Sequence, residues 1–371
     1  MCKRLFFALF YVFLVLLLSL SIFASSPYDG ISAKGAVLIE AESGTVVFEK
    51  NKDLALPMAS TTKIMTAIVA IENCPLSKKI TIPKEATGIE GSSIYLQQGE
   101  TLSVEELLYA LMLESANDAS VALAIASCGD LDSFVNLMNE KAVELGLEYT
   151  HFDNPHGLDS DEHYTTAYEL GLIARYAMKN PIFAEIVSTQ KKAIPLNNGE
   201  GTRVLINHNK LLRSFEGANG IKTGFTKKCG RCLVSSALVD GVSMICVTLN
   251  APNDWQDHKV MLEYGLSKYE GIELAETGDY VLELDVVNGQ KSTILVTNHD
   301  SLSVTLPKED IRISAQVEIN RLACAPISQG DLLGRIVFYN GEEQIGTLPL
   351  YALEGVQSID YKKSIFEKIF G

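Results

Sequence analysis

The chain has 371 residues, of which 47% are hydrophobic and 21% charged, and these values are typical of a globular protein rather than a disordered one. The length leaves room for two domains, each able to bury its own core. The formal net charge of −15 argues against a nucleic-acid partner, although it identifies no substrate.

The N-terminus carries the clearest targeting signal. Lys3 and Arg4 precede an apolar run over residues 5–24, and small residues follow at 24–26. A charged start, an apolar middle and a small-residue end describe a secretory signal, so we expect a signal peptide over residues 1–26. The run is also long enough to span a bilayer, which leaves an uncleaved anchor as the alternative. Either form predicts an exported protein, at the extracytoplasmic face of the membrane or secreted.

The first part of the chain mixes strand and helix patterns. Apolar, β-rich runs at 35–39 and 45–49 flank a Gly-containing turn and predict a β-hairpin. Helices are predicted over residues 60–71, 102–113, 116–126, 131–145, 166–178 and 255–269. Further strands are predicted over residues 220–225, 233–238 and 242–249. This order indicates an α+β domain, with an antiparallel sheet assembled from both ends of the segment.

The pattern S-x-x-K occurs at the start of the helix predicted over residues 60–71, where it consists of Ser60 and Lys63. Residues three apart share one face of a helix, so the two side chains are able to meet. A serine hydroxyl needs a base to take its proton, and a lysine amine serves when burial or a second cation lowers its pKa. The alternative is a helix start with an exposed lysine. A second match, Ser188 with Lys191, is interpreted as solvated surface.

The only S-x-N in the chain is Ser115-Ala116-Asn117, between two predicted helices. A junction of this kind can present short polar side chains to a cleft. Ser115 could pass a proton to a leaving amine, and the carboxamide of Asn117 could hydrogen-bond a substrate amide. The alternative is helix capping, because both residue types favour cap positions.

The only K-T-G is Lys222-Thr223-Gly224, on the predicted strand 220–225. A strand beside a nucleophile can pair with an extended peptide, and Lys222 and Thr223 would then bind a carboxylate. Gly224 would let the substrate backbone come close. Lys222 would also oppose protonation of Lys63, because like charges repel. The alternative is an exposed edge-strand lysine beside a turn glycine.

The pattern of predicted secondary structure changes near residues 276–279. Short β-rich runs then follow to about residue 352, with turn residues between them and no helical period. This texture predicts a small all-β second domain over residues 276–354, after a first domain over residues 27–275.

The last segment, 355–371, combines apolar residues with lysines. Its members are Ile365, Phe366, Ile369 and Phe370 against Lys362, Lys363 and Lys368. The pattern predicts a short amphipathic helix able to lie on an anionic membrane surface. A helix packed on its own protein is the alternative.

Six of the seven cysteines remain once Cys2 leaves with the signal: Cys74, Cys128, Cys229, Cys232, Cys246 and Cys324. An even number in an exported protein permits disulfides, but buried free thiols are the commoner explanation in apolar runs. Cys229 and Cys232 form a lone C-x-x-C without a second ligand pair, so we favour a structural role over a zinc or redox one.

The three motifs in the order S-x-x-K, S-x-N, K-T-G resemble those of the exported serine D-alanyl-D-alanine carboxypeptidases, the low-molecular-weight penicillin-binding proteins. The resemblance runs from about residue 35 to 352 and covers five stretches: Pro57 to Lys63, Ser115 to Ala119, Asn154 to Leu158, His163 to Leu170 and Gly220 to Thr226. One departure is Asn219, where an acidic residue is more usual.

The resemblance implies a DD-peptidase/β-lactamase-like catalytic domain, with an antiparallel sheet and a helical subdomain, followed by the all-β domain. It implies hydrolysis of the terminal D-Ala–D-Ala bond of peptidoglycan stem pentapeptides, without a metal or organic cofactor, and acylation of Ser60 by β-lactam antibiotics. The residues implied are Ser60, Lys63 and Ser115 (linked to Lys63) for catalysis, and Asn117, Lys222, Thr223, Gly224 and Phe225 for substrate binding. Backbone N–H groups near Ser60 and Phe225 would form the oxyanion hole.

Two other functions stay open at this point. A β-lactamase would share the site but must hydrolyse its acyl-enzyme quickly, and we identify no dedicated carboxylate for that step. A catalytically silent wall-binding protein would keep the fold without the reaction.

Overall fold

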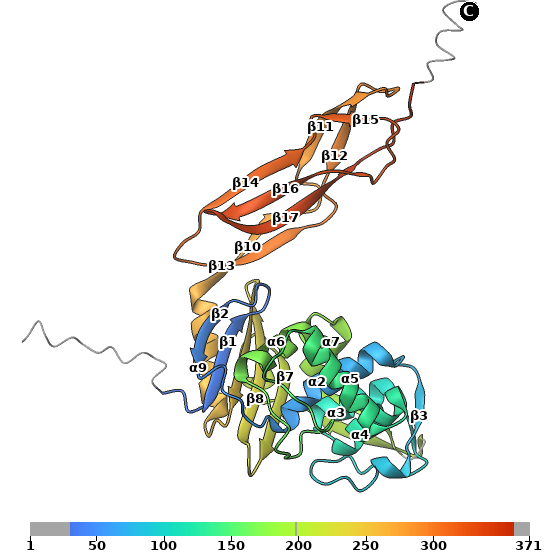
Figure 1. Cartoon of the computed structure of the whole chain (residues 1–371), viewed down its shortest axis with the longest axis vertical. Coiled ribbons are helices and arrows are strands. Elements are labelled where there is room, and N and C mark those ends of the chain that lie inside the picture. The colour runs from blue at the N-terminus through green and yellow to red at the C-terminus, as the bar shows by residue number, and fades with distance from the viewer. Residues whose placement is uncertain (1–29, 197–198, 360–371) are drawn as a thin grey trace, which may run out of the picture.

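The computed structural model describes residues 30–196 and 199–359. The predicted signal peptide, 1–26, and residues 360–371 of the predicted amphipathic segment lie outside this part of the chain. Two domains lie end to end, and they join where helix α9 (Asp254–Lys268) runs directly into strand β10 (Tyr269–Ala275) (Figure 1).

The first domain is built on a five-stranded sheet in the order β2-β1-β9-β8-β7, with every neighbouring pair antiparallel. Its strands are β1 (Gly35–Glu40), β2 (Val46–Lys50), β7 (Ala218–Thr226), β8 (Gly230–Val239) and β9 (Val242–Leu249). Val37 of the first hairpin pairs with Val247 of the last strand. The predicted sheet, assembled from both ends of the domain, is therefore confirmed.

Both faces of this sheet are covered, because side chains along a strand alternate in direction. Val37 and Ile39 of β1 enter the core shared with the helical subdomain, whereas Leu38 packs in the core beside α9. Helix α6 lies on the first face and α9 on the second, and each approaches through a glycine, Gly171 and Gly265 respectively. All six residues of β1 are accordingly buried.

The helical subdomain is inserted between β2 and β7 (Figure 1). Its helices are the 3₁₀ turn η1 (Ala59–Thr62), α2 (Lys63–Asn73), η2 (Lys84–Ala86), α3 (Val104–Leu113), α4 (Asn117–Cys128), α5 (Leu131–Glu144), α6 (Ala167–Met178), α7 (Pro181–Ser188) and α8 (Leu211–Ser214). Two small hairpins accompany them, formed by β3 (Lys79–Thr81) with β4 (Thr101–Ser103) and by β5 (Lys191–Leu196) with β6 (Gly201–Ile206).

The sequence-based prediction missed some of these elements and boundaries. The helix predicted over 102–113 begins only at Val104, because Ser103 ends β4 and its side chain caps α3 in a capping box with Glu106. Helix α7 and the β5–β6 hairpin were not predicted. Ser188 and Lys191, the second S-x-x-K match, are both exposed, as expected of solvated surface.

The second domain is all-β, as predicted, with its own hydrophobic core. A six-stranded sheet in the order β14-β16-β17-β12-β11-β15 is accompanied by the two-stranded sheet β10-β13. The remaining strands are β11 (Val281–Val287), β12 (Thr293–Thr297), β13 (Leu302–Pro307), β14 (Ile313–Ile319), β15 (Leu322–Cys324), β16 (Leu332–Asn340) and β17 (Glu343–Ala352). Because β10 pairs with β13, the segment 269–275, assigned to the first domain from sequence, belongs to this one.

All six cysteines of the described residues are free thiols. Burial raises the pKa of Cys229 to about 11 and that of Cys232 to about 12. Both groups are therefore protonated thiols of low reactivity at neutral pH.

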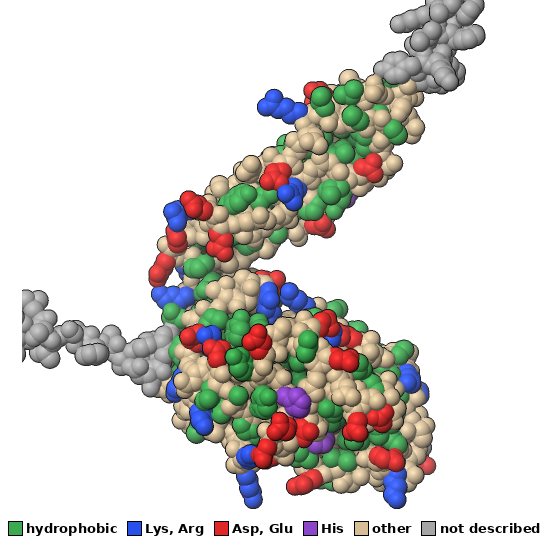
Figure 2. Space-filling model, viewed as in Figure 1, with side chains coloured by type: hydrophobic (Ala, Val, Ile, Leu, Met, Phe, Trp, Pro, Cys, Tyr) green, Lys and Arg blue, Asp and Glu red, His purple; other side chains and the backbone are tan. Residues whose placement is uncertain are grey.

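Acidic and basic side chains are interspersed over the face of the molecule shown in Figure 2. Among residues 30–196 and 199–359, no group of three or more His, Cys, Asp or Glu side chains is placed to hold a metal ion. In the same part of the chain no single helix is long and apolar enough to cross a membrane, although the bent pair α4 and α5 passes that test jointly.

Candidate active site

Ser60 and Lys63 lie together, as their spacing predicts, but on a different local structure. Ser60 belongs to η1, and the α-helix begins only at Lys63. Side chains three residues apart are eclipsed in a 3₁₀ helix, so the turn still places the two on one side. Lys63 Nζ lies 3.0 Å from Ser60 Oγ.

The amine of Lys63 is fully buried and has two further oxygen partners. Its Nζ donates to Asn117 Oδ1 at 2.7 Å and to the backbone carbonyl of His156 at 2.5 Å. Burial, and secondarily the charge of Lys222, hold the pKa of Lys63 well below its ordinary value, while Asp118 opposes the shift. The alternative of an exposed lysine is therefore wrong.

Ser115 and Asn117 occupy the junction between α3 and α4, and both are buried. Ser115 has a left-handed backbone with φ +60°. The capping alternative is wrong, because the N-cap of α4 is Ala116 and makes no side-chain cap.

The expected link between Ser115 and Lys63 is not formed among the described residues. The oxygens around Lys63 Nζ belong to Ser60, Asn117 and His156, and an ammonium has only three protons to donate. Asn117 makes contacts within the protein at both ends of its carboxamide, and its hydrogen bond to a substrate amide stays a prediction. Its Oδ1 accepts from Lys63, and its Nδ2 donates to the Glu90 carbonyl at 2.5 Å, which leaves one N–H for a substrate.

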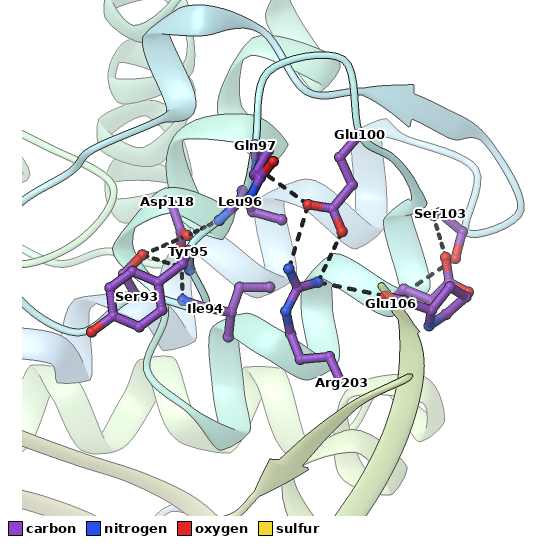
Figure 3. A network of polar contacts seen from close by, with 11 residues as sticks. Ser93, Ile94, Tyr95, Leu96, Gln97, Glu100, Ser103, Glu106, Asp118 and Arg203 are labelled. Atoms are coloured by element: carbon purple, nitrogen blue, oxygen red, sulfur yellow. Dashed lines mark hydrogen bonds and ion pairs between the residues drawn. The ribbon is translucent and has the colours of Figure 1, made fainter. Parts of the chain in front are cut away.

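The residue after Asn117, Asp118, holds a loop to which no role was assigned from the sequence. Its buried carboxylate accepts from Ser93 Oγ at 2.6 Å and from the N–H groups of Leu96 and Ile94 at 2.9 and 3.3 Å (Figure 3). The far end of the loop is fixed to β6 by an ion pair between Glu100 and Arg203, 3.0 Å long. The same loop carries Glu90, so these contacts place the carbonyl that binds Asn117.

The K-T-G residues lie on β7, the end strand of the sheet. Lys222 is only 1% exposed, so the alternative of a solvated edge lysine is wrong. Its Nζ donates to the Thr223 carbonyl at 2.8 Å, and burial lowers its pKa to about 7. Thr223 is half-buried, whereas Phe225 is 63% exposed. The departure at Asn219 is accommodated by a hydrogen bond from Ser236 Oγ across the β7–β8 hairpin, 2.6 Å long.

Gly224 packs closely against the protein's own backbone. A Cβ at this position would lie 3.1 Å from the backbone nitrogens of Ser60 and Thr61, and 3.2 Å from the Met58 carbonyl. The expectation that Gly224 also makes room for the substrate stays a prediction. Only a glycine lets β7 pack this closely against the turn that carries Ser60.

The segment 154–157 also belongs to the site, although no role was assigned to it from sequence. It supplies the His156 carbonyl to Lys63, and the Pro155 carbonyl accepts from Thr66 Oγ1 at 2.6 Å. Gly157 has φ +85°, and a Cβ there would come within 2.0 Å of the Ala59 carbonyl oxygen. The resemblance of this stretch to the family was the available signal, but backbone carbonyls cannot be assigned roles from residue types.

Comparisons with known proteins agree with this geometry. The family model for D-alanyl-D-alanine carboxypeptidase matches residues 22–253, and the model for the C-terminal domain of penicillin-binding protein 5 matches residues 269–358. The D-alanyl-D-alanine carboxypeptidase DacF of Bacillus subtilis (strain 168) is 33% identical over 344 residues, covering 90% of this chain and 87% of that relative.

Solved structures extend the similarity to the fold. Penicillin-binding protein 5 from Haemophilus influenzae is 27% identical with a TM-score of 0.67, covering 88% of this chain and 98% of that one. The Streptomyces K15 DD-transpeptidase is 33% identical with a TM-score of 0.61, covering 64% of this chain and 98% of that one.

An antiparallel sheet with an inserted helical block, and a serine beside a buried lysine and a K-T-G strand, are typical of the serine DD-peptidases and the related class A β-lactamases. The chain belongs to the D-alanyl-D-alanine carboxypeptidase family, the low-molecular-weight penicillin-binding proteins. The family, the fold class and the enzyme class predicted from the sequence are thereby confirmed.

Proposed function

We propose that the protein is an exported serine DD-carboxypeptidase that removes the terminal D-alanine from peptidoglycan stem pentapeptides through an acyl-enzyme at Ser60. The observation that carries this proposal is the fully buried amine of Lys63, 3.0 Å from Ser60 Oγ, with a lowered pKa. Such a pair provides a nucleophile and its base without a metal.

The partners of Lys63 fit a neutral amine. A neutral amine has two N–H groups and one lone pair. The oxygens of Asn117 and His156 accept the two N–H groups, because a carbonyl oxygen can only accept. The lone pair is then left for the hydroxyl of Ser60, which donates its proton as Oγ attacks the penultimate D-Ala carbonyl. The charge of Lys222 and the burial of the site favour this protonation state.

The substrate would lie along β7. An end strand can pair with an extended peptide, and Lys222 with Thr223 would hold the terminal carboxylate. The N–H groups of Ser60 and Phe225 would bind the oxyanion, which is supported by the close packing of Gly224 against the Ser60 nitrogen. Ser115 would carry the proton from Lys63 to the departing D-alanine once substrate has rearranged the site. Water then hydrolyses the acyl-enzyme.

Two further properties follow from the same chemistry. β-Lactam antibiotics would acylate Ser60, because they present a similar acyl bond beside a carboxylate. Export is supported by the predicted signal over residues 1–26, and contact with a membrane surface by the amphipathic pattern of 355–371.

A β-lactamase is the second candidate, and the site argues against it. Among the described residues no carboxylate contacts Ser60 Oγ or Lys63 Nζ, and Asp118 is engaged by its loop. Stopped-flow measurements with a labelled penicillin separate the two functions. We expect one equivalent of long-lived adduct, whereas rapid turnover would indicate a lactamase.

The Ser60→Ala variant tests the proposed reaction and the catalytically silent alternative. Release of D-alanine from a stem pentapeptide is measured for the wild type and the variant. We expect release by the wild type and background release by the variant. Undiminished release by the variant would refute the serine mechanism, and no release by the wild type would favour a silent wall-binding protein.

A further inference from the structure

A chain of hydrogen bonds leads from a buried histidine to the residue before Ser60. The Asp153 N–H donates to His163 Nδ1 at 3.0 Å, and His163 Nε2 lies 2.7 Å from Thr62 Oγ1. Thr62 Oγ1 in turn donates to the Ala59 carbonyl oxygen at 2.8 Å. His163 is 3% exposed and Thr62 1%, so water does not compete for these bonds.

The donor and acceptor of each hydrogen bond follow from the two ends of the series, the Asp153 N–H and the Ala59 carbonyl. A backbone N–H can only donate, so His163 Nδ1 is the acceptor and the imidazole proton sits on Nε2. Nε2 then donates to Thr62 Oγ1, whose own proton is directed to the Ala59 carbonyl. The imidazole is neutral, because burial lowers its pKa to about 4. Each of the three donors in this series of hydrogen bonds therefore has one acceptor.

The series of hydrogen bonds ends at the backbone segment that orients Ser60. Ala59 has φ +49°, a left-handed conformation that alanine adopts unfavourably and that its surroundings must hold. Thr62 binds the Ala59 carbonyl, and Gly157 packs against the same oxygen. Rotation of this peptide would turn both the Ser60 N–H and the Ser60 side chain.

We propose that His163 is a positioning residue for acylation: it fixes the hydroxyl of Thr62, which holds the Ala59–Ser60 peptide so that Ser60 faces Lys63. The proposal rests on the proposed serine mechanism. A packing role is the competing explanation, since His163 also makes an edge contact with Phe152, with ring centroids 5.8 Å apart.

Two amide substitutions separate the functions of the imidazole nitrogens. In His163→Gln the amide nitrogen reaches the position of Nε2 and can still donate to Thr62. In His163→Asn the side chain is shorter, so its oxygen can replace Nδ1 as acceptor for Asp153 but nothing reaches Thr62. The readouts are the acylation rate constant with benzylpenicillin, kcat and KM on a D-Ala–D-Ala peptide, and the melting temperature.

We expect His163→Asn to lower the rate constant of acylation by benzylpenicillin about 10- to 100-fold, because misplacement of a nucleophile by an ångström costs about that much. On the D-Ala–D-Ala peptide the loss should appear in kcat, with KM little changed. His163→Gln should recover most of the lost rate. Thr62→Val should show the same loss as His163→Asn, Thr62→Ser should recover it, and the His163→Asn/Thr62→Val double variant should be no slower than either single variant.

A matched control is His258, another buried histidine with two side-chain partners, Ser235 and Thr248, between the sheet and α9. His258→Asn should lower the melting temperature and leave the acylation rate unchanged.

Equal rates for His163→Asn and the wild type, or equal losses for the Asn and Gln variants, would overturn the positioning role. A wild type that is not acylated at Ser60 would overturn the proposed function itself, and this inference with it.

Discussion

At the scale of single residues, the site depends on two buried amines without carboxylate partners. Within the described residues neither Lys63 nor Lys222 forms an ion pair, and both have lowered pKa values. The residue types and their spacing were predictable from the sequence. Burial was not, because it is set by packing among β7, α2 and the junction before α4, which lie far apart in the chain.

The pH dependence of catalysis should report both amines. The base must be neutral to accept a proton, so kcat/KM should rise with pH as the Lys63–Lys222 pair loses its first proton. The lowered pKa of Lys63 assigns that first proton to Lys63. Lys222, with a pKa of about 7, is charged below that pH and neutral above it, so carboxylate binding weakens as pH rises through about 7. We expect a bell-shaped profile for D-alanine release from an acylated D-Ala–D-Ala peptide.

The control for this profile is a thioester substrate whose leaving group lacks a carboxylate. Its profile should keep the rising limb and lose the falling one. A falling limb near pH 7 with this substrate would contradict the role given to Lys222.

Asn117→Asp tests whether Lys63 must be neutral. The substitution keeps the side-chain shape but puts a carboxylate 2.7 Å from Lys63 Nζ, which raises the pKa of the amine. Acylation by penicillin at pH 7 should fall about 10- to 1,000-fold, the effect of a pKa shift of about 1–3 units, and recover at higher pH. The melting temperature should fall, because Asp cannot donate to the Glu90 carbonyl as Asn117 Nδ2 does, so recovery of acylation at higher pH is the diagnostic result. Wild-type acylation at pH 7 would contradict a neutral base.

At the scale of elements, the site is made by the contact between η1 and β7. The sequence predicted a helix beginning at residue 60 and a strand over 220–225, and both exist with shifted ends. It did not predict that the first turn is 3₁₀. Ala59 at φ +49° and Gly157 against its carbonyl impose that shape through tertiary contacts, which no local propensity encodes.

Gly224→Ala tests this contact. The added methyl group would press on the Ser60 and Thr61 nitrogens, so β7 and η1 must separate by a few tenths of an ångström. We expect acylation to slow about 10-fold or more while urea denaturation shows a loss of about 1–3 kcal/mol in the free energy of unfolding.

The comparison for Gly224→Ala is Gly146→Ala. Gly146, unlike Gly224, has open space around it, although its positive φ gives it a strain cost of its own. That variant should lose stability without slowing acylation. Equal acylation rates for the two variants would mean that the close packing of β7 has no catalytic consequence.

At the scale of the whole molecule, the first domain and the all-β domain bury separate hydrophobic cores. The α+β architecture and the all-β texture after it were predictable, because strand and helix periods differ along the chain. The boundary was predicted too late, at residue 276, because α9 continues into β10 without any linker composition. Only the pairing of β10 with β13 places that strand in the second domain.

Truncation after Lys268 should therefore leave a folded catalytic domain. The cut falls between α9, which packs on the first sheet, and β10, which pairs with the second domain. We expect kcat/KM on a soluble D-Ala–D-Ala peptide within about 3-fold of the full chain, because no group of the proposed site lies beyond the cut. Loss of acylation by a truncated protein with a cooperative unfolding transition would place part of the site in the second domain.

The most direct test of the central claim is to map the penicillin adduct by mass spectrometry of proteolytic peptides. The account predicts a single covalent adduct on Ser60 in the wild type, formed slowly in Asn117→Asp and absent in Ser60→Ala. An adduct on any other residue, or one that persists in Ser60→Ala, would contradict it.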